Sequence, residues 1–137
     1  MATQVMMTQV YYFSAAHRLH TEELSAEVNQ KIFGKCNNPH GHGHNYTVLV
    51  TVSNEAEPHN VMIDREALDQ LVRARIVDRF DHQHLNHDPA FQNVVTTGEN
   101  LAKLIWDLLV KEIPDGQLQK IGVIETRDNY FEYTGNR

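Results

Sequence analysis

Cysteine is almost absent from this sequence, because Cys36 is the only one among 137 residues. A single cysteine cannot form an internal disulfide, so Cys36 is either a small buried side chain or a thiol kept for its reactivity. No apolar run approaches the roughly 18 residues of a membrane span. The first ten residues have neither the basic start nor the apolar stretch of a secretory signal peptide, which predicts a cytoplasmic location.

Positive charge is also scarce. The 12 Lys and Arg residues face 18 Asp and Glu residues, which gives a formal net charge of −6. Nucleic-acid binding depends on clustered cations that face phosphates, so we expect neither a nucleic-acid nor a membrane partner. Low-complexity stretches and Gly/Ser-rich linkers are missing too, and the length fits one domain over residues 1–137.

Four segments have the composition of β-strands. Residues 8–17 are rich in aromatic and other β-favouring residues, and residues 45–52 alternate between apolar and polar side chains. Near the C-terminus, residues 120–126 and 130–133 flank a short polar turn, which predicts a hairpin. Residues 19–35 fit no single element.

Two segments show helical spacing. After Asp64, a favourable N-cap, apolar residues recur at helical intervals as far as Phe80. A second helix is predicted from Thr96 and Glu99, which stand in capping-box spacing, to the region of Pro114. The order strand, strand, helix, helix, strand, strand predicts an α+β fold, with a four-stranded antiparallel sheet that carries both helices on one face.

The stretch CNNPHGHGHNY, residues 36–46, concentrates potential metal ligands. Side chains two apart in a strand share a face, so His42 and His44 are expected to point the same way, and His17 ends the other predicted strand. Three protein nitrogens and one open position are typical of catalytic zinc. His40 also lies two residues from His42, so spacing alone leaves His40 and His44 as alternative ligands.

Two further groups have side chains suited to proton transfer. Cys36 precedes His42 by six residues, and a nearby cation would raise its thiolate fraction, so it can act as a base. Asp81 and His82 form an adjacent carboxylate and imidazole, in which the carboxylate can orient the ring. His84 and His87 follow, either as a second metal site or as a solvated loop, and we leave them outside the predicted site.

Glu125 falls on the same face of its predicted strand as Ile121 and Val123. An unpaired buried carboxylate is costly, so Glu125 either has a partner or lies at a solvated strand end. A carboxylate on a rigid strand can accept two parallel N–H donors, such as those of a 2-amino-pyrimidinone edge.

Five blocks, YFSAAHRL, CNNPHGHGHNYTVLVTV, FDHQHLN, VVTTGENLAKLIWDLL and GVIET, resemble the 6-pyruvoyltetrahydropterin synthase family in order and spacing. That family also contains the 6-carboxytetrahydropterin synthases of queuosine biosynthesis. The resemblance implies a tunnelling fold in which trimers form a barrel and two barrels stack into a homohexamer, with active sites between subunits. Such an assembly would cover the open edges of a small sheet.

The resemblance also implies roles for individual residues. His17, His42 and His44 resemble the zinc ligands, and Cys36 resembles the proton-abstracting base. Asp81 and His82 resemble the proton-relay pair, contributed by a neighbouring subunit. Glu125 resembles the residue that grips the pterin ring and is also described as part of the relay, while Thr97 and Glu99 fall in a second pterin-contacting segment.

The implied reaction converts 7,8-dihydroneopterin triphosphate to 6-pyruvoyltetrahydropterin and triphosphate, with zinc as the cofactor. Five residues separate Cys36 from His42, as in the pyruvoyl-forming branch, whereas three separate the corresponding residues of the queuosine branch. The alternatives are a 6-carboxytetrahydropterin synthase and a zinc-binding module without catalysis.

Overall fold

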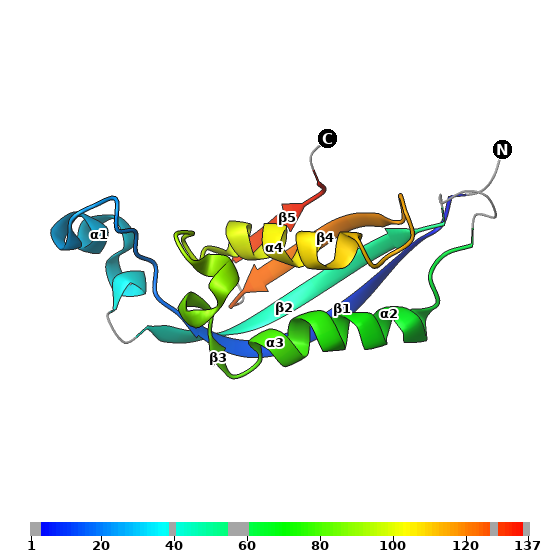
Figure 1. Ribbon diagram of the computed structural model, residues 1–137, viewed down its shortest axis with the longest axis horizontal. Helices are drawn as coiled ribbons and strands as arrows, with labels where there is room; N and C mark the ends of the chain where they lie inside the picture. Colours follow the sequence, from blue (N-terminus) through cyan, green and yellow to red (C-terminus); the bar gives the residue numbers. More distant parts are fainter. Residues whose placement is uncertain (1–3, 39–40, 55–60, 127–128, 136–137) are drawn as a thin grey trace.

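A computed structural model of the chain describes residues 4–38, 41–54, 61–126 and 129–135, and within this part the strands form one sheet with the order β3-β1-β2-β4-β5. The strands are β1 Met6–His17, β2 His42–Ser53, β3 Gln83–His84, β4 Leu118–Glu125 and β5 Asn129–Tyr133. The α-helices are α1 Ala26–Phe33, α2 Arg65–Val72, α3 Asp78–Phe80 and α4 Gly98–Val110. Figure 1 shows α2, α3 and α4 against the sheet.

The predicted α+β class is confirmed, and the four predicted strands are antiparallel neighbours in the order β1-β2-β4-β5. The sheet differs from the prediction by a fifth strand, β3, whose two residues pair in parallel with Ala15 and Ala16 of β1. Two residues cannot display a period, so this strand leaves no pattern in the sequence.

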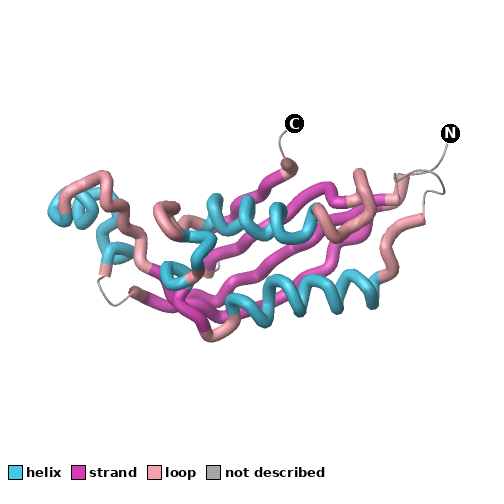
Figure 2. Tube along the Cα trace, in the orientation of Figure 1, coloured by secondary structure: helices cyan, strands magenta, loops and turns pink. Residues whose placement is uncertain are grey.

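The core lies between one face of the sheet and the helices that cover it (Figure 2). Tyr11, Phe13 and Ala15 of β1 are buried, and the residues between them are more exposed, as alternation along a strand requires. They form one cluster with the apolar faces of α2 and α4. The same face of β1 carries the buried His17 at the strand's end.

The helix predicted after Asp64 is present, but its middle is wider than an α-helix. The π-helical segment η2, Arg73–Val77, joins α2 to α3. Apolar side chains face the core at every fourth position, namely Leu68, Val72, Ile76 and Phe80. Residues four apart in an α-helix drift by about 40° per step, and the wider π turn takes up part of that drift. The segment therefore keeps a strict four-residue repeat facing the sheet.

The start of α4 differs from the predicted cap. Thr97 is the N-cap, and its hydroxyl oxygen accepts the backbone N–H of Asn100 at 3.1 Å. The Thr96 hydroxyl instead donates to the carbonyl oxygen of Arg18 at 3.2 Å. The helix begins one residue later than the capping-box spacing predicts, because Thr96 is tied to the chain that follows β1.

The segment that the sequence left open contains α1, which lies apart from the other helices, beyond one end of the sheet (Figure 1). The Ser25 side chain caps its N-terminus by accepting the N–H of Val28. The buried Asn29 side chain binds both the N–H and the carbonyl oxygen of Thr21, at 2.8 Å each. This helix is followed by the 3-10 turn η1, Gly34–Asn37.

Candidate metal centre and active site

Three imidazoles meet at the end of the two long central strands. In the β1–β2 register, His17 lies directly opposite His42, and His44 lies two residues further along β2 on the same face. The ring centroids are 4.5 to 4.8 Å apart. One potential ligand nitrogen from each ring lies within 4.8 Å of the other two, so the three residues could hold a metal ion.

The ring of His17 is fixed by a hydrogen bond at one of its nitrogens. The Nδ1 atom of His17 lies 2.7 Å from the carbonyl oxygen of Thr96, which can only accept, so Nδ1 carries the proton and Nε2 has a free lone pair. This Nε2 atom is buried and makes no hydrogen bond. An orphaned imidazole nitrogen that faces two other imidazoles fits a metal ligand.

The electrostatics of the cluster favour neutral imidazoles. Burial lowers the pKa of His17 to about 4, although the Thr96 carbonyl opposes this shift. Burial also lowers the pKa of His42 and of His44. The Nε2 atoms of these two residues are only 2.7 Å apart, so a proton or a cation must lie between them. Three neutral imidazole nitrogens are a donor set found in catalytic zinc sites, so the residues present fit that ion.

Glu125 is buried beside the triad, so of the two alternatives that the sequence left open the solvated strand end is excluded. Its Oε1 atom lies 3.0 Å from His44 Nε2 and 3.4 Å from His17 Nε2. A Cβ atom at Gly98 would come within 3.2 Å of Glu125 Oε2 and would overlap the ring of Phe131. The absence of a side chain at Gly98 therefore lets the N-terminus of α4 approach the carboxylate. Burial raises the pKa of Glu125.

Asp81 and His82 form the predicted contact, with 3.0 Å between Asp81 Oδ2 and His82 Nδ1. They lie at the outer edge of β1, on the side away from β2. Asp81 Oδ1 accepts the N–H of Ser14 at 2.9 Å, and the N–H of His82 donates to the Ser14 carbonyl oxygen at 2.6 Å. The Ser14 N–H is the main cause that lowers the pKa of Asp81. The His82 side chain is 81% exposed, so this pair faces outward.

The remaining residues that the sequence singled out lie outside the triad or outside the described part of the chain. The backbone of Cys36 lies in η1, but its side chain is outside the described part, and so is the whole of His40. The Thr97 hydroxyl is engaged as the N-cap of α4, and Glu99 lies exposed in the first turn of that helix. His84 and His87 stack at 4.5 Å and do not belong to the triad.

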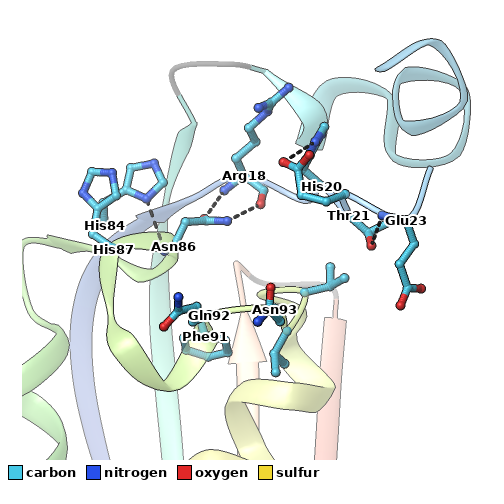
Figure 3. A pocket seen from close by; sticks show the side chains of 13 residues that line it. Arg18, His20, Thr21, Glu23, His84, Asn86, His87, Phe91, Gln92 and Asn93 are labelled. Carbon is cyan, nitrogen blue, oxygen red and sulfur yellow. Dashed lines mark hydrogen bonds and ion pairs between the residues drawn. The ribbon is translucent and has the colours of Figure 1, made fainter. Parts of the chain in front are cut away.

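A cavity of about 500 Å³ lies at the same end of the sheet (Figure 3). Its wall includes Arg18, which follows His17 in the chain, and Val95, which precedes Thr96. Asn86 holds the backbone of Arg18 by accepting its N–H at 2.7 Å and donating to its carbonyl oxygen at 2.8 Å. The cavity therefore adjoins the triad without being lined by it.

Sequence reasoning missed three supporting groups: the Thr96 carbonyl, the Asn86 side chain and the Thr126 hydroxyl. A backbone carbonyl has no signature in the sequence. Asn86 lies among histidines with nothing in its spacing that indicates a contact with Arg18, and the position of Thr126 after Glu125 does not by itself indicate a contact with His44.

Known proteins resemble this chain along almost its whole length. The protein-family model for 6-pyruvoyl tetrahydropterin synthase matches residues 6–136. The 6-pyruvoyl tetrahydrobiopterin synthase of Homo sapiens is 46% identical over 134 residues, which cover 96% of this chain and 92% of that protein. The protein of the same name from Drosophila melanogaster is 39% identical over 132 residues, covering 94% of this chain and 79% of that protein.

Solved structures also resemble this chain over nearly its whole length. The structure of Caenorhabditis elegans 6-pyruvoyl tetrahydropterin synthase has a TM-score of 0.85 and 39% identity, covering 98% of this chain and 97% of that chain. The Plasmodium vivax 6-pyruvoyl tetrahydropterin synthase, with a TM-score of 0.70 and 14% identity, covers 99% of this chain and all of that one, and it supports the fold alone.

The fold and the imidazole cluster thus define a candidate metalloprotein with an α+β architecture. This chain belongs to the 6-pyruvoyl tetrahydropterin synthase family. In the part that the structure describes, none of the helices has the length and apolar character required to cross a membrane.

Proposed function

We propose that this protein is a zinc-dependent 6-pyruvoyltetrahydropterin synthase, a lyase that converts 7,8-dihydroneopterin triphosphate to 6-pyruvoyltetrahydropterin and triphosphate. The observation that carries the proposal is the cluster of His17, His42 and His44 beside a buried carboxylate, in a chain 46% identical to a relative of that name. The product and the triphosphate account for all substrate atoms, and the internal redox rearrangement requires no external oxidant.

The proposed metal ligands are His17, His42 and His44. Zinc bound there would supply Lewis-acid polarisation of the side-chain hydroxyl oxygens of the substrate. The protein contributes neutral nitrogens, because burial lowers the pKa of all three imidazoles. It also fixes the His17 ring through the Thr96 carbonyl, which leaves Nε2 free to bind.

The proposed proton-transfer groups are Cys36, Asp81 and His82. The Cys36 thiolate would remove a proton from the substrate side chain, and His82 would return protons during the rearrangement. Asp81 holds one ring nitrogen of His82 at 3.0 Å, so that the other nitrogen is left for the substrate. Elimination then breaks the carbon–oxygen bond to triphosphate, which leaves with the bonding electron pair.

Pterin recognition is assigned to Glu125, with Thr97 and Glu99 in a supporting role. A carboxylate can accept two N–H bonds from the aminopyrimidinone edge. The raised pKa of buried Glu125 shows that its charged form is poorly solvated, and two donors from a ligand would compensate for the lost water. Thr97 and Glu99 lie next to Gly98, which approaches the same carboxylate.

We also propose a homohexamer built from two trimeric barrels, with active sites between subunits. In the described part of the chain, β3 covers the outer edge of β1 only at Ala15 and Ala16, and β5 is the last strand at the opposite edge. Asp81 and His82 lie at the β1 edge and face outward. An outward-facing relay pair can serve the triad of a neighbouring copy.

The decisive experiment supplies zinc-loaded protein with 7,8-dihydroneopterin triphosphate and identifies the products by mass spectrometry. We expect 6-pyruvoyltetrahydropterin and free triphosphate, with Cys36→Ala as the inactive control. A 6-carboxy product with acetaldehyde would assign the protein to the queuosine branch. No turnover by the metal-loaded protein would favour a zinc-binding module without catalysis.

A further inference from the structure

Thr126, the first residue after β4, has an unusual backbone. Its φ is 60°, in the left-handed region that β-branched residues rarely occupy. Side chains alternate along a strand, so the residue after Glu125 would ordinarily point to the opposite face of the sheet. The left-handed backbone interrupts this alternation, and the Thr126 hydroxyl turns back towards the triad.

The hydroxyl reaches one of the proposed metal ligands. Thr126 Oγ1 lies 2.6 Å from His44 Nδ1, and the Thr126 N–H donates to the carbonyl oxygen of Asn45 at 3.2 Å. Thr126 is thus tied to β2 by its backbone at Asn45 and by its side chain at His44. A strained conformation that places one polar group against a ligand suggests that the contact is functional.

The partner of the second ring nitrogen differs among the three ligands. His17 faces a carbonyl, which fixes one tautomer, whereas His42 Nδ1 is buried and makes no hydrogen bond. His44 faces a hydroxyl, which can either accept or donate. If the hydroxyl accepts from Nδ1–H, then Nε2 carries the lone pair. If it donates to Nδ1, then Nε2–H can donate either to Glu125 Oε1, which is 3.0 Å away, or to His42 Nε2, which is 2.7 Å away.

We propose that Thr126 is a positioning residue whose hydroxyl supports the His44 tautomer with the proton on Nδ1, which leaves the Nε2 lone pair to bind the metal. This inference rests on the proposed zinc centre. With zinc bound, the Thr126 hydroxyl accepts a hydrogen bond from Nδ1–H, and Nε2 has no proton to donate to Glu125. The carboxylate is then free to bind the ligand edge assigned to it. Thr126 therefore connects metal binding to the availability of Glu125.

The test measures zinc affinity by competition with a chromophoric chelator. Thr126→Val removes the hydroxyl and keeps the β-branch, and we expect it to weaken zinc binding by about 10- to 100-fold, the usual effect of losing a partner of a metal-bound histidine. Thr126→Ser keeps the hydroxyl and should bind within about threefold of the unaltered protein. Thr8→Val is the matched control, because its hydroxyl pairs with Thr51 far from the triad.

Long-range ¹H–¹⁵N spectra of the metal-free proteins provide a second readout, because zinc on Nε2 would by itself force the proton onto Nδ1. The metal-free unaltered protein and Thr126→Ser should show His44 with its proton on Nδ1, and Thr126→Val should show a mixture of the two tautomers. Circular dichroism checks that each variant is folded. If Thr126→Val does not fold, Thr126→Ala removes the same hydroxyl without a branched side chain and replaces it in the comparison.

Two results would overturn the role of Thr126 alone: zinc affinity of Thr126→Val equal to that of the unaltered protein, or an equal loss in Thr126→Ser. If the unaltered protein binds no zinc, then the metal centre and the role of Thr126 both fail. Loss of affinity in Thr8→Val as large as that in Thr126→Val would attribute the effect to general destabilisation and would also contradict the proposal.

Discussion

The imidazole triad is carried by long hydrogen-bonded strands, whereas the candidate proton-transfer residues are carried by short turns. His17, His42 and His44 lie on β1 and β2, which pair through twelve consecutive positions. Cys36 lies in a four-residue 3-10 turn, and Asp81 follows the last turn of α3. The candidate metal ligands thus lie on paired strands of one chain, whereas the candidate proton-transfer groups lie on turns.

The same comparison explains what the sequence could predict. The spacing of His42 and His44, with His17 at the end of the neighbouring strand, was enough to predict that the three rings converge, because a strand has a period of two. The contact between Asp81 and His82 was also predicted from adjacency. Regular elements repeat, and a repeat can be read from one sequence.

Other features depend on contacts that no local pattern encodes. The strand β3 exists because two residues meet the edge of β1, and α1 exposes Val28 and Ile32 instead of burying them in the core. Glu125 was assigned to pterin, and its closeness to His44 and His17 required the β2–β4 register. The roles of Thr97 and Glu99 rest on family resemblance alone, that of Cys36 rests also on its spacing from His42, and all three stay predictions.

The largest effect on kcat is expected from replacing Cys36, the proposed base, which lies in a turn. Cys36→Ala should lower kcat by about 10²- to 10⁴-fold, the contribution of a positioned proton-transfer group. Zinc content should be unchanged, because no strand-borne ligand is altered. Metal analysis and steady-state kinetics on one preparation provide the measurement, and Cys36→Ala with full activity would remove Cys36 from the mechanism.

The second prediction removes one of the candidate metal ligands on the strands. His42→Ala should weaken zinc binding by more than the roughly 10- to 100-fold that follows loss of a supporting partner, because it removes a ligand itself. Chelator competition measures the affinity, with His87→Ala as a histidine control outside the triad. Unchanged zinc binding in His42→Ala would show that a different ligand, such as His40, completes the site.

A smaller effect is expected at the outward-facing pair. Asp81→Asn should lower kcat on the order of 100-fold, the lower end of the range for proton-transfer groups, and should leave zinc affinity intact. Co-expression of Asp81→Asn with His42→Ala should restore part of the activity if one chain supplies the relay pair and another supplies the triad. Mixed assemblies without any recovery would place both groups in the same subunit.

The smallest effect is on stability, and it concerns the ion pair between Arg79 of α3 and Asp88. Arg79 donates two hydrogen bonds to Asp88, at 2.7 and 2.9 Å, and these bonds lower the pKa of Asp88 below its ordinary value of 3.8. Because the two groups are partly exposed, Asp88→Asn should cost about 1 kcal/mol of unfolding free energy at pH 7.

The pH dependence of this contribution has a definite sign. A lowered pKa means that the ion pair stabilises the fold above pH 3.8 and loses its effect as the pH falls through the still lower value in the folded protein. The unfolding free energies of the unaltered protein and of Asp88→Asn, measured with urea, should therefore differ at pH 7 and become equal in stronger acid. An equal difference at both pH values would exclude Asp88 ionisation as its cause.

The π-helical segment Arg73–Val77 has a consequence for how the gene can change. A π turn holds one more residue than the α turn it replaces, so deleting a single codon there would leave a helix able to close as regular α. After such a deletion, eleven α-helical steps would separate Leu68 from Phe80, and they turn through about three whole turns, so Phe80 would still face the core. Single-residue deletions within Arg73–Val77 should therefore be tolerated better than deletions within the regular helix α4, where the residues that follow would rotate by about 100°.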